Sequence, residues 1–174
     1  IVKKILSNGA DKVVINSNLN LKLLKEISRT YGQQSIIASI DYKKARGKYK
    51  IFIKNSVEEL KISVKDYLMK VVNFPVGEIM LNSIDQDGTG NGIDFKILKF
   101  LPKKIKKSII ISGGCGNSIH LSEGLNNKKV DAVSTANLLN FVGDGLKKAR
   151  EDMLSKNFKL PIWDVKTINK LKGK

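Results

Sequence analysis

The chain has 174 residues, and 32 Lys and Arg against 16 Asp and Glu give it a formal net charge of +16. A hydrophobic fraction of 41% with a charged fraction of 28% is typical of a folded domain and excludes an intrinsically disordered chain. No apolar run approaches the roughly 18–20 residues that cross a bilayer, so no membrane span is expected. A single cysteine, Cys115, excludes an internal disulfide framework, and a reducing cytoplasm is the expected compartment.

The basic excess is almost entirely lysine, because only Arg29, Arg46 and Arg150 are arginines. Proteins that read nucleic acids usually use arginine as well, since its planar guanidinium pairs bidentately with phosphate and guanine. The scattered lysines therefore favour a solvated, lysine-rich surface. A basic nucleic-acid-binding module is a remote alternative, which salt-dependent retention on nucleic acid would reveal.

Short apolar strands alternate with amphipathic helices along the chain. In the first half, we predict strands at 12–16 and 35–41, a hairpin strand at 48–54, a helix at 19–31 ended by Gly32, and a helix capped by Ser63. In the second half, we predict strands at 78–85, 108–112 and 130–137, a short helix after Asp94, a helix capped by Ser118, and a helix at 144–156.

This alternation predicts βαβ units, a parallel sheet and the α/β fold class. Polar residues follow the strands, as at the active face of a (β/α)8 TIM barrel, although an open doubly wound sheet would place ligands there too. A full barrel needs about 250 residues. We therefore expect residues 1–174 to form a single barrel domain with strands four to eight and without its N-terminal strands.

Two segments suit phosphate binding. Gly113 and Gly114 follow a strand and offer bare backbone N–H groups, with Ala136 and Asn137 as the opposite wall. Asn16 and Ser17 hold the same place on an earlier strand and predict either a second phosphate site or an ordinary Asx turn.

Charged residues occupy the two ends of the strands. Asp41 ends a buried apolar strand, where a carboxylate can act as a general acid or base. A metal is not expected, because the acidic cluster around Asp85 and Asp87 is sparse. Lys12 and Glu78 begin strands at the opposite end, where charges are either paired or exposed at the rim. His120 and Cys115 are expected to pack rather than to react.

The segments 9–17, 37–41, 77–89 and 112–114 resemble the cyclase subunit of imidazole glycerol phosphate synthase in order and spacing, up to about residue 155. The most specific piece is the run Ser-Ile-Asp-x-Asp-Gly-Thr at 83–89. The resemblance implies a (β/α)8 barrel that receives ammonia from a glutaminase partner in a heterodimer. It implies cyclisation of a bisphosphorylated ribotide in histidine biosynthesis, without a cofactor.

The resemblance also assigns residues. Asp41 is implied to be one of two catalytic aspartates, and Asp87 to lie beside the reacting substrate. Lys12 and Glu78 match two charges of an ammonia gate, and Asp11 falls where the family meets its glutaminase. The implied phosphate and substrate residues are Asn16, Ser17, Asn82, Gly88, Thr89, Gly113, Gly114, Ala136 and Asn137.

Some positions depart from the family pattern. The family's first catalytic aspartate lies on a strand that this sequence does not contain, so the chain alone is expected to be inactive. Asn82 and Asn137 stand where the histidine enzyme usually has Thr and Ser. The segment 82–85 looks more like paralogues that are thought to supply ammonia for amidation of surface-polysaccharide sugars.

Overall fold

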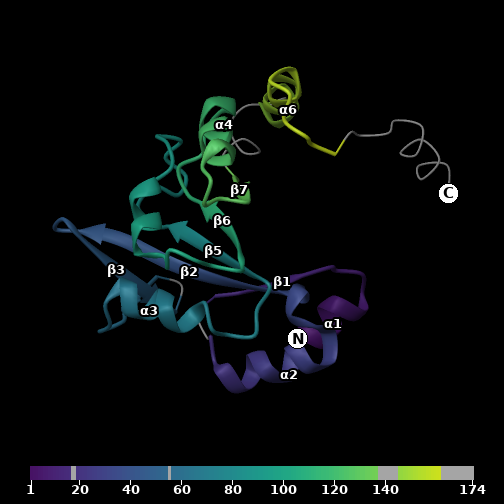
Figure 1. Ribbon diagram of the computed structural model, residues 1–174, viewed down its shortest axis with the longest axis vertical. Coiled ribbons are helices and arrows are strands. Elements are labelled where there is room, and N and C mark those ends of the chain that lie inside the picture. The colour runs from purple at the N-terminus through teal and green to yellow at the C-terminus, as the bar shows by residue number, and fades with distance from the viewer. Residues whose placement is uncertain (17–18, 55, 137–144, 162–174) are drawn as a thin grey trace.

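The structure is a computed structural model that describes residues 1–16, 19–54, 56–136 and 145–161 (Figure 1). It is an α/β fold built on one seven-stranded sheet. The parallel strands follow one another across the sheet in chain order: β1 (Val13–Ile15), β2 (Ile36–Ala45), β5 (Glu78–Ser83), β6 (Ser108–Ser112) and β7 (Ala132–Ser134). The predicted α/β class and parallel sheet are confirmed.

A hairpin extends the sheet beyond its parallel part. The prediction that the strand from residue 35 ends at Asp41 was wrong, because β2 continues to Ala45 and pairs antiparallel with β3 (Lys48–Ile53). Arg46 and Gly47 form the turn with φ of 50° and 75°, a left-handed pair that matches the twist of a tight hairpin. A short strand, β4 (Glu58–Glu59), adds to the outer side of β3.

The helices are mostly those the sequence predicts. The described elements are α1 (Val2–Ser7), α2 (Leu21–Tyr31), the 3-10 turns η1 (Gln33–Ser35) and η2 (Phe95–Phe100), α3 (Val64–Val71), α4 (Ser118–Asn126) and α6 (Gly145–Ser155). The sequence analysis did not predict α1. It predicted a short helix after Asp94, and the structure has the 3-10 helix η2 there. The predicted cap of α4 was also wrong, because Asn117, not Ser118, accepts the N–H of His120 at 2.9 Å.

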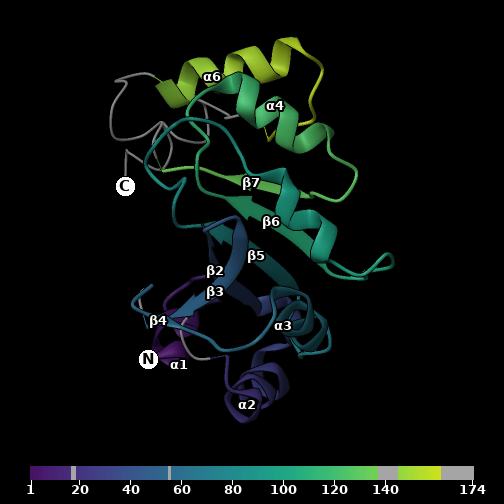
Figure 2. The same cartoon turned by 90° about the vertical axis from the view of Figure 1, so that its left-hand side faces the viewer.

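The core lies between the sheet and the helices on one of its faces. Strands β2, β5 and β6 bury alternate aliphatic residues there, among them Ile36, Ile40, Leu81 and Ile111, each no more than 2% exposed. α2 and α3 add Leu24 and Leu68, both fully buried. Figure 2 shows α4 and α6 together near one end of the sheet, where the two helices contact each other.

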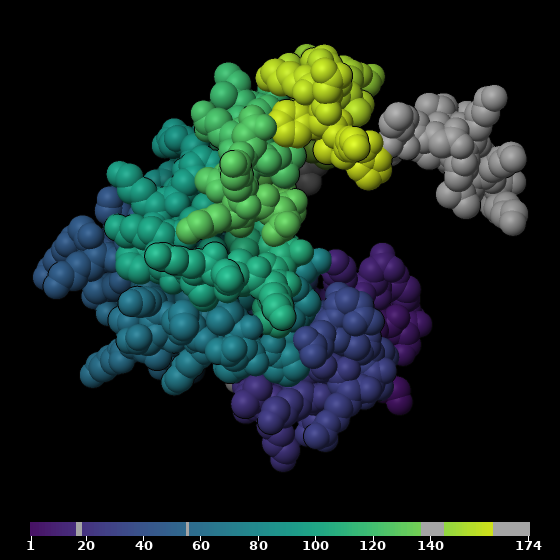
Figure 3. All heavy atoms as spheres, in the orientation of Figure 1, coloured from purple at the N-terminus to yellow at the C-terminus, as the bar shows by residue number. Residues whose placement is uncertain are grey.

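The other face of the same strands carries a different set of side chains. It presents Val14, which is 57% exposed, and the polar residues Ser39, Asp41 and Asn82. In the space-filling view the molecule is hollowed between its N-terminal residues and the region of α6 (Figure 3). None of the helices in the described ranges has the length and apolar character that a bilayer crossing requires.

Candidate functional site

Four polar residues form one row across the parallel sheet. The strand register pairs Asp41 with Asn82, Asn82 with Ser112, and Ser112 with Ser134. Paired residues on in-register strands project from the same face, so the four side chains share the face opposite the core. The row lies near the carboxyl ends of β5, β6 and β7, where parallel α/β sheets bind their ligands.

Asp41 is held in a defined orientation. It is only 4% exposed, and each of its carboxylate oxygens accepts a hydrogen bond. The Ser56 hydroxyl donates to Oδ2 at 3.0 Å, and the Asn82 amide donates to Oδ1 at 3.0 Å. Both donors are neutral, and no described lysine or arginine forms an ion pair with this carboxylate. A fixed carboxylate without a charged partner suits proton transfer.

Two glycine-rich loops interlock beside the row. The N–H of Gly92 donates to the carbonyl oxygen of Gly114 at 2.8 Å, and Gly114 has φ of +86°. A Cβ at Gly114 would lie 2.0 Å from the Gly92 oxygen, and one at Gly113 would lie 2.4 Å from the Ser83 oxygen. Because both contacts are to backbone atoms, only glycine allows the loops to approach this closely.

A pocket of about 310 Å³ opens between the row and these loops. It brings together six of the predicted residues, Asn82, Asp87, Gly88, Gly113, Gly114 and Ala136, with Ser39, Ser112, Ser134 and Thr135. The sequence analysis assigned no site role to Ser39, Ser134 or Thr135, and it included Ser112 only as the first residue of the glycine motif. Ser112 and Ser134 are each the last residue of a strand, and their common position becomes visible only when β6 and β7 are aligned in register.

The pocket has the donors that an anion needs. Among the described residues, the N–H groups of Gly88 and Gly114 have no backbone acceptor. Such N–H groups, held by left-handed glycines, form concave sites for phosphate. Cys115 is buried beside them, and burial raises the pKa of its thiol, so the thiolate needed for a nucleophile is disfavoured. The predicted packing role of Cys115 is therefore favoured.

Other predicted residues do not line this pocket. Thr89 turns its hydroxyl to the Gln86 carbonyl oxygen at 2.8 Å, within its own loop. Asn16 is half-buried just after β1. The second phosphate site, which pairs Asn16 with Ser17, stays a prediction. Ser17 and Asn137 lie outside the described residues.

Lys12 and Glu78 form an ion pair across the amino end of β2, where the sequence left paired and exposed charges as alternatives. The side chain of Lys12 is 42% exposed and that of Glu78 is 19% exposed. Asp11 is exposed beside them. These three charges therefore lie at the opposite end of the strands from the glycine loops.

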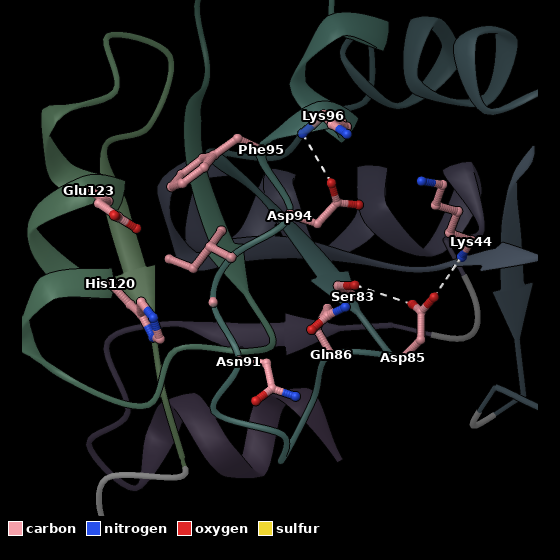
Figure 4. A pocket seen from close by; sticks show the side chains of 12 residues that line it. Lys44, Ser83, Asp85, Gln86, Asn91, Asp94, Phe95, Lys96, His120 and Glu123 are labelled. Carbon is pink, nitrogen blue, oxygen red and sulfur yellow. Dashed lines mark hydrogen bonds between the residues drawn. The ribbon is translucent and has the colours of Figure 1, made fainter. Parts of the chain in front are cut away.

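A larger pocket, of about 640 Å³, lies on the helix-covered side of the sheet (Figure 4). Three carboxylates line it, from Asp85, Asp94 and Glu123, together with two lysines and His120. The carboxylates oppose a phosphate, so this pocket is a poorer anion site than the smaller one. Asp85 and His120 also have structural roles: Asp85 accepts the Lys44 N–H at 2.9 Å, and the His120 Nδ1 accepts the Gly116 N–H at 3.2 Å.

Comparison with known proteins identifies the family of the chain. Residues 1–143 match the model of the family described as histidine biosynthesis protein, and the chain belongs to that family. The resemblance inferred from the sequence motifs is thereby confirmed at the level of the family.

Two relatives carry more specific names. A protein of Parasynechococcus marenigrum, named provisionally as imidazole glycerol phosphate synthase subunit hisF2, is 45% identical over 151 residues, 86% of this chain and 56% of the relative. A Leptospira biflexa protein, named imidazole glycerol phosphate synthase subunit HisF, is 34% identical over 163 residues, 91% of this chain and 64% of the relative. The chain thus spans 56% to 64% of the length of these relatives.

The close approach of the two glycine loops leads us to predict how glycine substitutions change the free energy of unfolding. Gly114→Ala combines a left-handed backbone with a clash against the Gly92 oxygen, so we expect it to lower the free energy of unfolding by roughly 3 kcal/mol. Gly88→Ala is the matched control, because it has φ of +77° with open space around a Cβ. It should cost only about 1 kcal/mol. Urea unfolding measures both, and equal losses would contradict the interlock.

Proposed function

We propose that the protein carrying this chain is the cyclase subunit of imidazole glycerol phosphate synthase, a cytoplasmic lyase. It would use ammonia from a glutaminase partner to cyclise a bisphosphorylated ribotide. The observation that carries the proposal is the fixed Asp41 carboxylate in one row with the side chains that line a phosphate-sized pocket. Membership of the histidine biosynthesis family and the names of the two relatives support it.

Each part of the site has a role in this reaction. Asp41 moves a proton to or from the substrate as a general acid or base. The N–H groups of Gly88 and Gly114 bind one phosphate, and the hydroxyls of Ser112 and Ser134 orient the substrate beside it. Asp87, exposed on the same loop as Gly88, faces the reacting part of the ligand.

Ammonia enters at the opposite end of the strands. Lys12 and Glu78 act there as part of a gate, and their ion pair lies at the amino edge of the sheet. Asp11 is exposed beside this pair, as a residue that contacts a glutaminase needs to be. On this proposal, ammonia enters between these charges and travels toward Asp41.

One observation favours a second candidate at the same site. Asn82, which departs from the usual Thr of the histidine enzyme, donates to Asp41 and occupies one of its oxygens. In a paralogue for amidation of surface-polysaccharide sugars, the barrel would pass ammonia to a separate amidotransferase, and Asp41 would have no ribotide to convert. Family membership favours both candidates over a nucleic-acid-binding module.

The proposal is tested by ammonia-dependent turnover of the ribotide, using the protein that carries this chain at its natural length. We expect Asp41→Asn to reduce the rate at least about 100-fold, because it removes the proton-transfer group and keeps the side-chain shape. Asp66→Asn, an exposed carboxylate at the start of α3, is the matched control and should leave the rate unchanged. Absence of turnover in the unmodified protein would reject the cyclase and favour the sugar-amidation paralogue.

The proposed gate leads to a separate prediction about the coupling between glutamine hydrolysis and product formation. With the glutaminase present, Lys12→Met leaves Glu78 without its partner, so ammonia should escape before it is used. We expect more glutamine to be hydrolysed than product formed, measured as the ratio of the two. Lys156→Met breaks a surface pair with Asp152 and should keep the ratio near one to one. An unchanged ratio in Lys12→Met would argue against a gate.

A further inference from the structure

A third pocket, of about 530 Å³, lies between the β2–β3 hairpin, the start of α3 and η2. It is on the helix-covered side of the sheet, because Lys44 follows Tyr42 at the two-residue period of β2, and Tyr42 is fully buried in the core. None of its lining residues belongs to the glycine-loop pocket. We call it the lysine pocket.

The charge of this pocket is one-sided. Five lysines line it, Lys44, Lys48, Lys65, Lys96 and Lys99, and no carboxylate does. In the described ranges, lysine ion pairs are formed by Lys12, Lys50, Lys54 and Lys156, and none of the five takes part in one. Clustered cations without internal partners create a local potential that attracts an anion.

The carboxylate of Asp94 is hydrogen-bonded to two residues that line this pocket. The single hydroxyl proton of Tyr49 is shared between the two carboxylate oxygens of Asp94, at 2.8 and 3.0 Å, and the backbone N–H of Lys96 donates to Asp94 at 3.1 Å. Burial and the bonded Asp94 raise the pKa of Tyr49, so its hydroxyl keeps the donated proton. The hydrogen bonds that Asp94 accepts within the described residues thus come from neutral donors. Lys44 and Lys96 also line the larger pocket that contains Asp85, Asp94 and Glu123, whereas Lys48, Lys65 and Lys99 line only the lysine pocket of the two.

Two aromatic rings give the pocket an apolar wall. Tyr49 and Phe100 meet edge to face, with ring centroids 5.4 Å apart, and the Lys99 ammonium lies 5.1 Å from the Phe100 centroid. Buried Val64 adjoins them. The volume falls within the range of about 300–1,000 Å³ that holds small molecules. A concave site of this size fits a compact ligand better than the long backbone of a nucleic acid.

We propose that the lysine pocket binds a small anion with two or more phosphate groups, which the five ammonium groups hold. Lysine is suited to this task as a point charge for phosphate. The anion is either a nucleotide, whose base lies on Phe100, or an inorganic polyphosphate. The inference is independent of the cyclase reaction, because it uses none of the residues assigned to that site.

Calorimetric titration with tripolyphosphate at low salt tests the proposal. We expect K65Q/K99Q to weaken binding at least about 10-fold, because it removes two charges from two walls of the pocket. The control K22Q/K25Q removes the same net charge from exposed positions on α2 and should change the affinity less than about 2-fold. Absence of binding, or equal weakening by both double variants, would overturn the proposal. Binding that K65Q/K99Q does not weaken would belong to another site and would overturn it as well.

Further ligands identify the source of the phosphates. ATP that binds more tightly than tripolyphosphate, with the gain lost in Phe100→Leu, would support a nucleotide. Equal affinities would support the polyphosphate group alone. A short single-stranded oligonucleotide that binds more tightly than both, and loses affinity equally in the two lysine variants, would overturn the proposal in favour of a nucleic-acid-binding surface.

Discussion

The register of the parallel strands is the constraint on which the rest of the site depends. It aligns Asp41, Asn82, Ser112 and Ser134 in one row, although the first and last lie on strands nearly a hundred residues apart in the sequence. Side chains alternate between the faces of a strand, so a shift by one residue would exchange the polar row for core residues. The buried aliphatic side chains of the helix-covered face fix the register, and the site on the other face follows from it.

The run Ser-Ile-Asp-x-Asp-Gly-Thr places residues on both faces of the sheet. Asp85 lies on the helix-covered side, where it accepts the Lys44 N–H and ties the hairpin to the end of β5. Asp87 and Gly88 line the glycine-loop pocket on the other side. A motif of seven residues therefore both anchors the local fold and supplies part of the candidate site.

Local patterns in the sequence were enough to predict most of the helices and strands and the position of the Gly113–Gly114 loop. Alternating strands and helices gave the α/β class, and Gly113 and Gly114 were found because bare N–H groups after a strand suit phosphate. The prediction of Ser118 as the cap of α4 was wrong because the residue before it, Asn117, belongs to a type that caps helices equally well. The extension of β2 could not be predicted from its own residues, because it depends on pairing with β3.

The unpredicted parts of the site are contacts between distant segments. Ser56 reaches Asp41 from the turn after β3, and Ser134 joins the row only through the pairing of β6 with β7. A serine in a strand has no distinctive local signal, in contrast to a glycine pair or an isolated carboxylate. The ion pair of Lys12 with Glu78 likewise joins residues 66 positions apart.

The proposed function depends on a phosphate site that the interlocked glycine loops would form beside Asp41. The most direct measurement is a titration of the isotopically labelled protein with inorganic phosphate, followed through its backbone amide NMR signals. We expect the amide signals of Gly88, Gly113 and Gly114 to shift together and to saturate. If these signals stay unchanged while amides on the lysine-rich surface move, phosphate does not bind at the glycine loops, and the proposed site is wrong.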